Sequence, residues 1–136
     1  MFRVLIRLAN LFDREKSVDL FLPVSNTSTL SIVPTEELIR LGLTPDTVLP
    51  FCRPGGEHVD RSVGTALLTV HGVTMPVPLV FGEEGDFSVL GSTSLELLGF
   101  AFDSVEGRLF RCPLRRFAIV GHSDPQAPKR DSRMTA

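Results

Sequence analysis

Apolar and polar residues alternate along short stretches of this chain, and turn-forming residues separate one stretch from the next. In residues 2–9 the even-numbered positions are apolar, and Arg3 and Arg7 fall between them. Residues 18–24 repeat the alternation after residues 10–16, a polar stretch with turn formers. A period of two is typical of a strand with one buried face, so these two stretches predict a long hairpin.

Further strands are predicted wherever a short apolar or alternating stretch is bounded by glycine, proline or other turn residues. A tight turn is expected at residues 53–56, another at His71-Gly72, and a polar loop at residues 82–86. The predicted strands are residues 47–52, 59–70, 73–81, 87–90, 100–103 and 108–111. Many short strands with frequent turns indicate an all-β closed barrel or sandwich.

Two short helices are predicted between the strands. The first begins at Thr35, a candidate N-cap followed by two glutamates in the first turn, and it ends at Gly42. The second covers residues 92–99, where Thr93 and Glu96 form a capping-box pattern and Gly99 ends the helix. Neither helix is long enough to change the all-β class.

The length of 136 residues suits one domain with its own core. The net charge is −2 and the basic residues are scattered, which disfavours the dense basic surface that nucleic-acid binding requires. One basic cluster is interpreted as a solvated face: Arg108, Arg111, Arg115 and Arg116. No stretch approaches the ~20 apolar residues that span a bilayer, and two arginines interrupt the apolar N-terminus. The expectation is a cytoplasmic protein without a membrane or nucleic-acid partner.

The two cysteines, Cys52 and Cys112, lie far apart in the sequence. They are interpreted as reduced, partly buried thiols, with a structural disulfide as the alternative. The cysteines and the three histidines lack the paired short spacings of zinc sites, so no metal and no cofactor are expected. Residues 121–136 are polar, contain proline and show no period, which predicts a disordered tail.

Five short motifs follow one another along the chain with regular spacing. They are Val24-Ser25-Asn26-Thr27-Ser28-Thr29 with Pro34 and Leu41-Gly42-Leu43 after it, Val63-Gly64-Thr65-Ala66, Phe81-Gly82-Glu83-Glu84-Gly85-Asp86, Val89-Leu90-Gly91 with Leu97-Leu98-Gly99, and Asp103 with Gly107-Arg108-Leu109. In this order they resemble the retropepsin-like (clan AA) aspartic proteases, in particular the small single-lobe proteins of prokaryotes. The resemblance spans residues 2–110, nearly the whole of the expected domain.

The resemblance implies an all-β fold, a retropepsin-like closed β-barrel with two short helices, over residues 1–120. It also implies a homodimer, because a single lobe must pair with a second copy to build its cleft. An extended peptide segment is then the implied ligand of that cleft, bound by strand addition.

The resemblance also assigns the site. The family's catalytic Asp-Thr-Gly falls on Ser25, Asn26 and Thr27. A register shifted by one residue puts Asn26 in place of the aspartate and Ser28 in place of the glycine. The implied peptide-binding positions are Ser28, Val63, Gly64, Leu90 and Gly91.

Either register removes the carboxylate on which aspartic proteases depend. These enzymes place two carboxyl groups so close that they share one proton, which makes one an acid and the other a base. Neither a serine hydroxyl nor an asparagine amide can replace that pair. The sequence therefore predicts an inactive homologue, a pseudoprotease that keeps a peptide-binding groove at a homodimer interface.

Two other functions stay open. One is an active aspartic-type endopeptidase, either alone or paired with an intact paralogue that supplies a carboxylate. The other is a structural scaffold without a ligand. The resemblance places Asp60, Asp86 and Asp103 away from the catalytic loop, and Asp86 is interpreted as a loop acid that accepts backbone N–H groups. A serine nucleophile would need a histidine base, and no nucleophile motif accompanies the three histidines, His58, His71 and His122.

Overall fold

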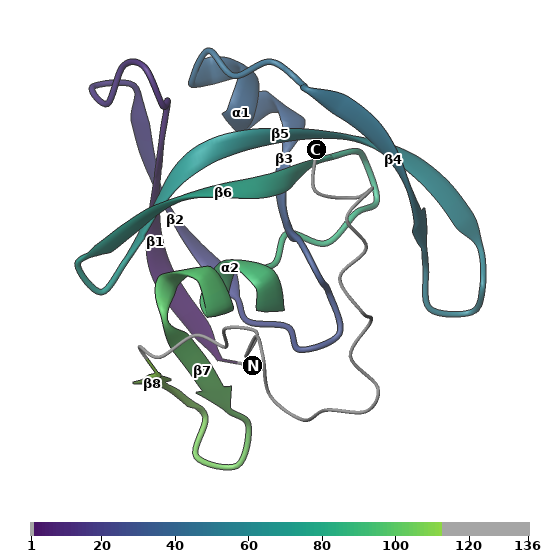
Figure 1. Ribbon diagram of the computed structural model, residues 1–136. Coiled ribbons are helices and arrows are strands. Elements are labelled where there is room, and N and C mark those ends of the chain that lie inside the picture. Colours follow the sequence, from purple (N-terminus) through teal and green to yellow (C-terminus); the bar gives the residue numbers. More distant parts are fainter. Residues whose placement is uncertain (1, 113–136) are drawn as a thin grey trace, which may run out of the picture.

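The computed structural model describes residues 2–112, which form eight strands and two short helices (Figure 1). In chain order the elements are β1 (Arg3–Ala9), β2 (Ser17–Pro23), β3 (Ser31–Pro34), α1 (Thr35–Arg40), β4 (Thr47–Cys52), β5 (His58–Val70), β6 (Val73–Gly82), α2 (Ser92–Leu98), β7 (Phe100–Asp103) and β8 (Arg108–Arg111). The all-β class with two short helices is confirmed for this part of the chain. The stretch predicted at 87–90 forms only isolated bridges.

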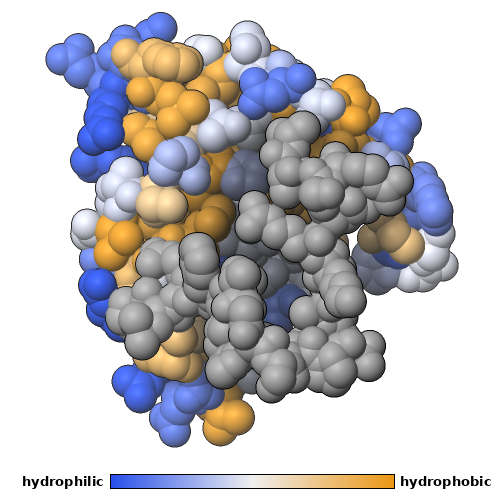
Figure 2. Space-filling model, in the orientation of Figure 1, coloured by the Kyte–Doolittle hydropathy of each residue, from blue (hydrophilic) through white to orange (hydrophobic). Residues whose placement is uncertain are grey.

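The alternation of the first hairpin has the predicted consequence. Strands β1 and β2 pair antiparallel, and the side chains of Val4, Ile6 and Leu8 are buried. On the opposite face Leu5 and Phe21 form an exposed cross-strand pair. Figure 2 shows hydrophilic and apolar side chains mixed along the left of the face in view.

One six-stranded sheet holds most of the strands, in the order β2-β1-β5-β6-β3, with β4 paired to β5. The pairs are antiparallel except β3 with β6, which is parallel. The long β5 contacts three strands, so it organises the sheet. A separate hairpin, β7 with β8, has the predicted bounds.

The closed barrel was a wrong prediction, because the two ends of the sheet, β2 and β3, do not pair. The segment that follows β6 inserts between them and makes one isolated bridge to each side, Val24 with Leu90 and Ile32 with Val89. Pro23 offers a carbonyl but no N–H at this point. Single bridges on either side of an inserted segment cannot form the continuous ladder that closes a barrel.

The hydrophobic core lies between the sheet and the two helices. Its fully buried members include Ile6, Leu8, Leu68, Leu79 and Leu90. Helix α1 contributes Leu38, and α2 contributes Leu95 and Leu98, to the same cluster.

Both helices lie where predicted, but neither has the predicted N-terminal cap. The hydroxyl of Thr35 donates to the carbonyl of Gly82 at 2.8 Å and caps nothing. The capping box of α2 is also absent, since no side chain caps its N-terminus. Instead, the N–H groups of Ser92 and Thr93 each donate at 2.9 Å to carbonyls of residues 28 and 29. Gly99 ends α2 with a φ of 82°, a left-handed conformation that glycine adopts without strain.

Some predictions fall outside the described residues: the segment from 113 to 120, the tail at 121–136, Arg115, Arg116 and His122. Within residues 2–112, neither helix has the length and hydropathy needed to cross a membrane. Both cysteines are free, as interpreted, but they are exposed rather than partly buried.

Candidate functional site

The loop between β2 and β3, residues 25–30, carries the positions that the resemblance assigned to catalysis; we call it the hydroxyl loop. Its fold depends on the side chain of Ser25. The Ser25 Oγ accepts the backbone N–H groups of Thr27 at 3.2 Å and Ser28 at 3.3 Å, and it shares a 3.0 Å hydrogen bond with the Thr27 Oγ1. A hydroxyl that organises its own turn in this way is a local structural group.

A second set of contacts fixes the end of the hydroxyl loop to the start of α2. The hydroxyls of Ser31 and Ser94 are buried and lie 2.6 Å apart, and the Ser31 Oγ accepts the N–H of Gly91 at 2.9 Å. A Cβ at Gly91 would lie 2.5 Å from the carbonyl carbon of Leu30, closer than packed atoms approach. Only glycine allows the backbone at residue 91 to approach that of Leu30 so closely. This close approach and the hydrogen bonds of Ser31 together hold the end of the hydroxyl loop against α2.

An open groove with a volume of about 940 Å³ runs along this loop. Ser25 and residues 27–30 line it from the hydroxyl loop, residues 50–54 with Val59 and Arg61 line it from the β4–β5 hairpin, and residues 85–87 line it from the loop after β6. Much of the lining is apolar: Leu30, Phe51, Val59, Val80, Phe87 and Val89. Phe87 is 85% exposed, an unusual environment for a phenylalanine side chain.

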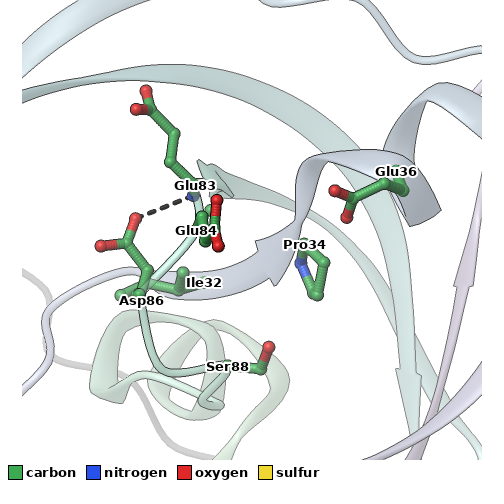
Figure 3. Close-up of a pocket in the computed structure, with 9 residues that line it drawn as sticks. Ile32, Pro34, Glu36, Glu83, Glu84, Asp86 and Ser88 are labelled. Atoms are coloured by element: carbon green, nitrogen blue, oxygen red, sulfur yellow. Dashed lines mark hydrogen bonds between the residues drawn. The ribbon is translucent and has the colours of Figure 1, made fainter.

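A smaller recess of about 300 Å³ adjoins the groove, and both are lined by Ile32, Gly85 and Asp86. Three glutamates also line this recess: Glu36 from α1, and Glu83 and Glu84 from the loop after β6 (Figure 3). We call it the acidic recess. Its chemistry therefore differs from that of the apolar groove beside it.

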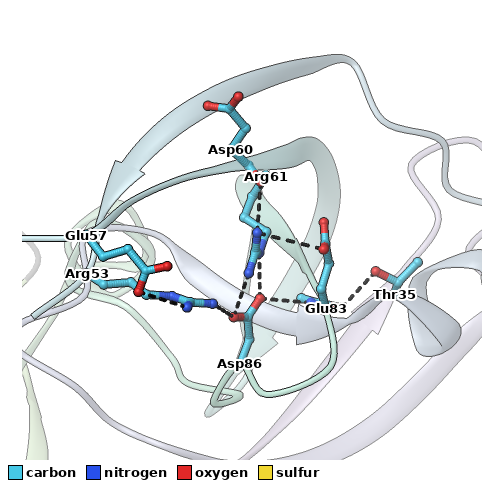
Figure 4. Close-up of polar contacts among 8 residues, drawn as sticks. Thr35, Arg53, Glu57, Asp60, Arg61, Glu83 and Asp86 are labelled. Atoms are coloured by element: carbon cyan, nitrogen blue, oxygen red, sulfur yellow. Dashed lines mark hydrogen bonds and ion pairs between the residues drawn. The ribbon is translucent and has the colours of Figure 1, made fainter.

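Asp86 lies where groove and recess meet, and two arginines hold it (Figure 4). Arg61 donates through Nε at 2.7 Å and Nη2 at 3.0 Å, and Arg53 donates through Nη2 at 3.0 Å. The backbone N–H of Glu83 adds a fourth bond at 2.8 Å. The bonds from Arg61 are the main reason why the pKa of Asp86 lies well below its ordinary value, since they outweigh the opposing effect of burial.

The interpretation of Asp86 as a loop acid that accepts a backbone N–H is confirmed, but its place is corrected. Asp86 lines the same groove as Ser25, rather than lying away from the hydroxyl loop. The two other acids lie outside the groove: Asp60 is exposed, and Asp103 accepts the N–H groups of its own turn, from Val105 and Glu106.

No histidine among residues 2–112 lines the groove or the acidic recess. His58 is exposed at the first position of β5. His71 occupies a turn with a φ of 48° and packs edge-on against Phe100 at 5.7 Å between ring centroids. Ser25 therefore has no imidazole beside it in the described part of the chain, and a serine nucleophile needs such a base.

The structure brings together only some of the predicted site residues. Ser25, Thr27 and Ser28 line the groove, whereas the exposed Asn26 is outside it. The remaining four lie in the interior and line neither cavity: Val63, Gly64, Leu90 and Gly91. A Cβ at Gly64, for example, would lie 2.8 Å from the ring of Phe81. Their predicted role in peptide binding stays a prediction.

In the described residues, no group of three or more histidine, cysteine, aspartate or glutamate side chains is arranged to hold a metal ion. Comparison of the chain with models of known families, with curated proteins and with solved structures finds no match. The function must therefore be argued from the groove itself.

Proposed function

We propose that this chain is a non-catalytic, retropepsin-like peptide-binding module that holds an extended segment against the hydroxyl loop without cutting it. The observation that carries the proposal is the open groove of about 940 Å³ between the hydroxyl loop and the β4–β5 hairpin. Its apolar walls, with hydroxyl and charged groups placed among them, are the usual composition of a binding cleft. The motif order described above supports the retropepsin-like assignment.

The polar groups of the groove favour binding over catalysis. Peptide hydrolysis by the aspartic mechanism requires a carboxyl group that exchanges its proton near the working pH. The carboxylate in this groove, that of Asp86, is kept ionised by Arg61 and Arg53. The Ser25 hydroxyl accepts hydrogen bonds from the N–H groups of Thr27 and Ser28 in its own turn. Neither group is free to move a proton during a reaction.

The β4 strand offers the backbone groups for an extended ligand. It pairs with β5 along one edge, and no other strand among residues 2–112 covers its second edge. Residues 50–52 of β4 line the groove, so a peptide that adds to this edge lies along the groove. Pro50 provides no N–H to pair with a ligand strand. Apolar side chains of the groove, such as Phe51, must then supply part of the affinity. We further propose that the module works as a homodimer, in which a second copy completes the cleft.

The absence of tryptophan and tyrosine gives a direct binding test. Phe87→Trp places a single indole in the groove, and Phe12→Trp, at a 96% exposed position outside it, is the matched control. A short peptide of alternating valine and threonine is titrated into each variant. We expect the emission of Phe87→Trp to move to shorter wavelength as peptide covers the ring, and the control to stay unchanged.

A second measurement does not rely on the reporter. A fluorescein-labelled version of the same peptide is titrated with the natural protein, with Phe87→Ser and with Phe12→Ser, and its anisotropy is followed. Loss of a buried aromatic contact should weaken binding by Phe87→Ser about tenfold, whereas Phe12→Ser should bind like the natural protein. Equal affinities for all three proteins, or no binding at all, would contradict the proposal. Sedimentation equilibrium tests the homodimer, which a monomer at tens of micromolar would contradict.

A further inference from the structure

The acidic recess adjoins the groove, so a ligand in the groove has a second cavity of different chemistry beside it. The two cavities share three lining residues, Ile32, Gly85 and Asp86. A strand extends by about 3.3 Å per residue, and its successive side chains point to opposite faces. An extended segment in the groove can therefore place one or two further side chains at the recess.

The carboxylates around the recess fall into two groups. Asp86 is engaged by two arginines, and Glu83 lies 3.8 Å from the Nη1 of Arg61. Glu36 and Glu84 are exposed and form no ion pair or side-chain hydrogen bond with any residue from 2 to 112. Figure 3 shows the carboxylate of Glu36 extending from α1 toward the loop that carries Glu84. These two charges remain available to a ligand.

The charge of the surrounding domain has the same sign. Residues 1–112 contain fourteen acidic and nine basic side chains, a net charge of −5, although the whole chain carries −2. A cationic ligand is therefore attracted at long range as well as at the recess. The charges of the nearby Arg53 and Arg61 are offset by three carboxylates: Asp86 bonds to both arginines, Glu57 lies 3.5 Å from Arg53, and Glu83 lies 3.8 Å from Arg61.

From the adjacency of the two cavities and the unpaired charges of Glu36 and Glu84, we infer that the groove selects a partner segment in which arginine or lysine adjoins an extended apolar run. This inference rests on the proposed peptide binding and adds the class of peptide. The apolar run lies along the β4–β5 hairpin, and the basic side chain lies at the acidic recess. An arginine suits two separate carboxylates because its guanidinium presents five N–H donors.

The test uses five fluorescein-labelled peptides and the chain of 136 residues. All five share one alternating valine and threonine run. In three of them Arg-Arg, Gln-Gln or Glu-Glu follows the run, and in two Arg-Arg or Gln-Gln precedes it, to allow either direction of binding. The expected result is that an Arg-Arg peptide binds about tenfold more tightly than its Gln-Gln partner, and the Glu-Glu peptide most weakly. The preference should shrink as salt is raised from about 0.05 M to about 0.5 M.

Variants locate the preference. Glu36→Gln with Glu84→Gln should remove most of the difference between the Arg-Arg and Gln-Gln peptides. Glu96→Gln with Glu106→Gln is the matched control, because it changes the net charge equally at two exposed glutamates that line neither cavity. The control should retain the preference. An equal loss in both double variants would show a long-range charge effect and overturn the assignment to the recess.

The remaining outcomes separate this inference from the proposed function. If the Arg-Arg and Gln-Gln peptides bind equally well to the natural protein, the groove binds peptides but does not select those with basic residues. If no peptide binds, the proposed function fails and the inference fails with it. If Arg115→Gln with Arg116→Gln increases the affinity for the Arg-Arg peptide tenfold, then the chain's own segment around Arg115 and Arg116 competes with the peptide and is the occupant of the groove. Dissociation of a dimer by Glu36→Gln with Glu84→Gln would identify a second copy instead, and either result overturns the assignment to a partner.

Discussion

The guanidinium of Arg61, on β5, donates two hydrogen bonds of 2.7 and 3.0 Å to the carboxylate of Asp86, which lies 25 residues later in the sequence. Both side chains are largely buried, with 12% and 11% of their surface exposed. The pair joins the β4–β5 hairpin to the loop after β6, so it fixes the position of two walls of the groove. Planar two-point pairing of this kind is specific to arginine.

Asp86→Asn should therefore destabilise the domain. The substitution keeps the size of the side chain but leaves Arg61 without a full counter-charge in a mostly buried position. We expect the free energy of unfolding to fall by about 2 kcal/mol. Urea denaturation measures the change. Asp60→Asn is the control, because Asp60 is exposed on β5, the strand that carries Arg61, and its carboxylate forms no ion pair with any residue from 2 to 112. Equal losses for both variants would show that the pair adds no stability.

The same pair makes stability depend on acid pH. The pKa of Asp86 is lower in the folded protein than in the unfolded chain, chiefly because Arg61 donates to its charged form. The unfolded state therefore binds the proton first, and the contribution of Asp86 is present above its unfolded pKa of about 4 and lost as the pH falls below it. Denaturation from about pH 6 to about pH 2 should show the natural protein and Asp86→Asn converging in stability. A constant difference at every pH contradicts this origin.

Restoring the missing carboxylate tests the absence of catalysis. The natural protein and Ser25→Ala should both fail to cleave peptides between about pH 3 and about pH 7, the range in which carboxyl groups titrate. The triple variant Ser25→Asp, Asn26→Thr, Thr27→Gly should cleave if two copies pair their loops. Cleavage by the natural protein that Ser25→Ala abolishes would make Ser25 catalytic and the proposed function wrong. Inactivity of a folded, dimeric triple variant would count against the retropepsin-like assignment.

Ser25→Ala should also loosen the hydroxyl loop. It removes the acceptor of two backbone N–H groups, those of Thr27 and Ser28, and should cost about 1 kcal/mol. Asn26→Ala is the control, because Asn26 is exposed and its side chain forms no hydrogen bond within residues 2–112. Thermal unfolding compares the two variants. A control as destabilised as Ser25→Ala would mean that the hydroxyl does not organise the turn.

Gly91→Ala should strongly destabilise the fold, because the added Cβ makes the shortest contact of any glycine described. The added Cβ would lie 2.5 Å from the carbonyl carbon and 2.6 Å from the carbonyl oxygen of Leu30, both of which are backbone atoms that cannot rotate away. We expect a loss above about 3 kcal/mol, or failure to fold. Ser92→Ala, one residue later, should lose less than about 1 kcal/mol, because the Ser92 hydroxyl has only a long 3.4 Å bond. Circular dichroism and urea denaturation of both variants give the comparison.

Strand periodicity was readable because it depends on neighbours in the chain. Alternation placed β1 and β2 within one residue of their bounds, and the turn residues between β7 and β8 placed that hairpin correctly. The positions of both helices were also readable, but the groups that satisfy their N-termini were not. Helix α2 takes its N-terminal partners from the carbonyls of Ser28 and Thr29, far back in the chain, so the local capping pattern of Thr93 was unused.

For the candidate site, the residues of the hydroxyl loop were found from the motif order, and Ser25, Thr27 and Ser28 do line one groove. The composition of its other walls could not be found, because Phe51 and Phe87 belong to strands and loops that meet only in the fold. For the four interior positions, such as Gly64, the motif marked a residue as special without saying whether it faces a ligand or the core.

By itself the sequence determined the all-β class, most strand positions, the ends of both helices and the lack of a carboxylate in the hydroxyl loop, since each depends on residue type and local spacing. Only the tertiary structure decided that the sheet stays open, that Arg61 holds Asp86 and that an apolar groove adjoins an acidic recess. Each of these depends on pairing between distant segments, whose geometry is set when the whole core packs and not by any one stretch of chain.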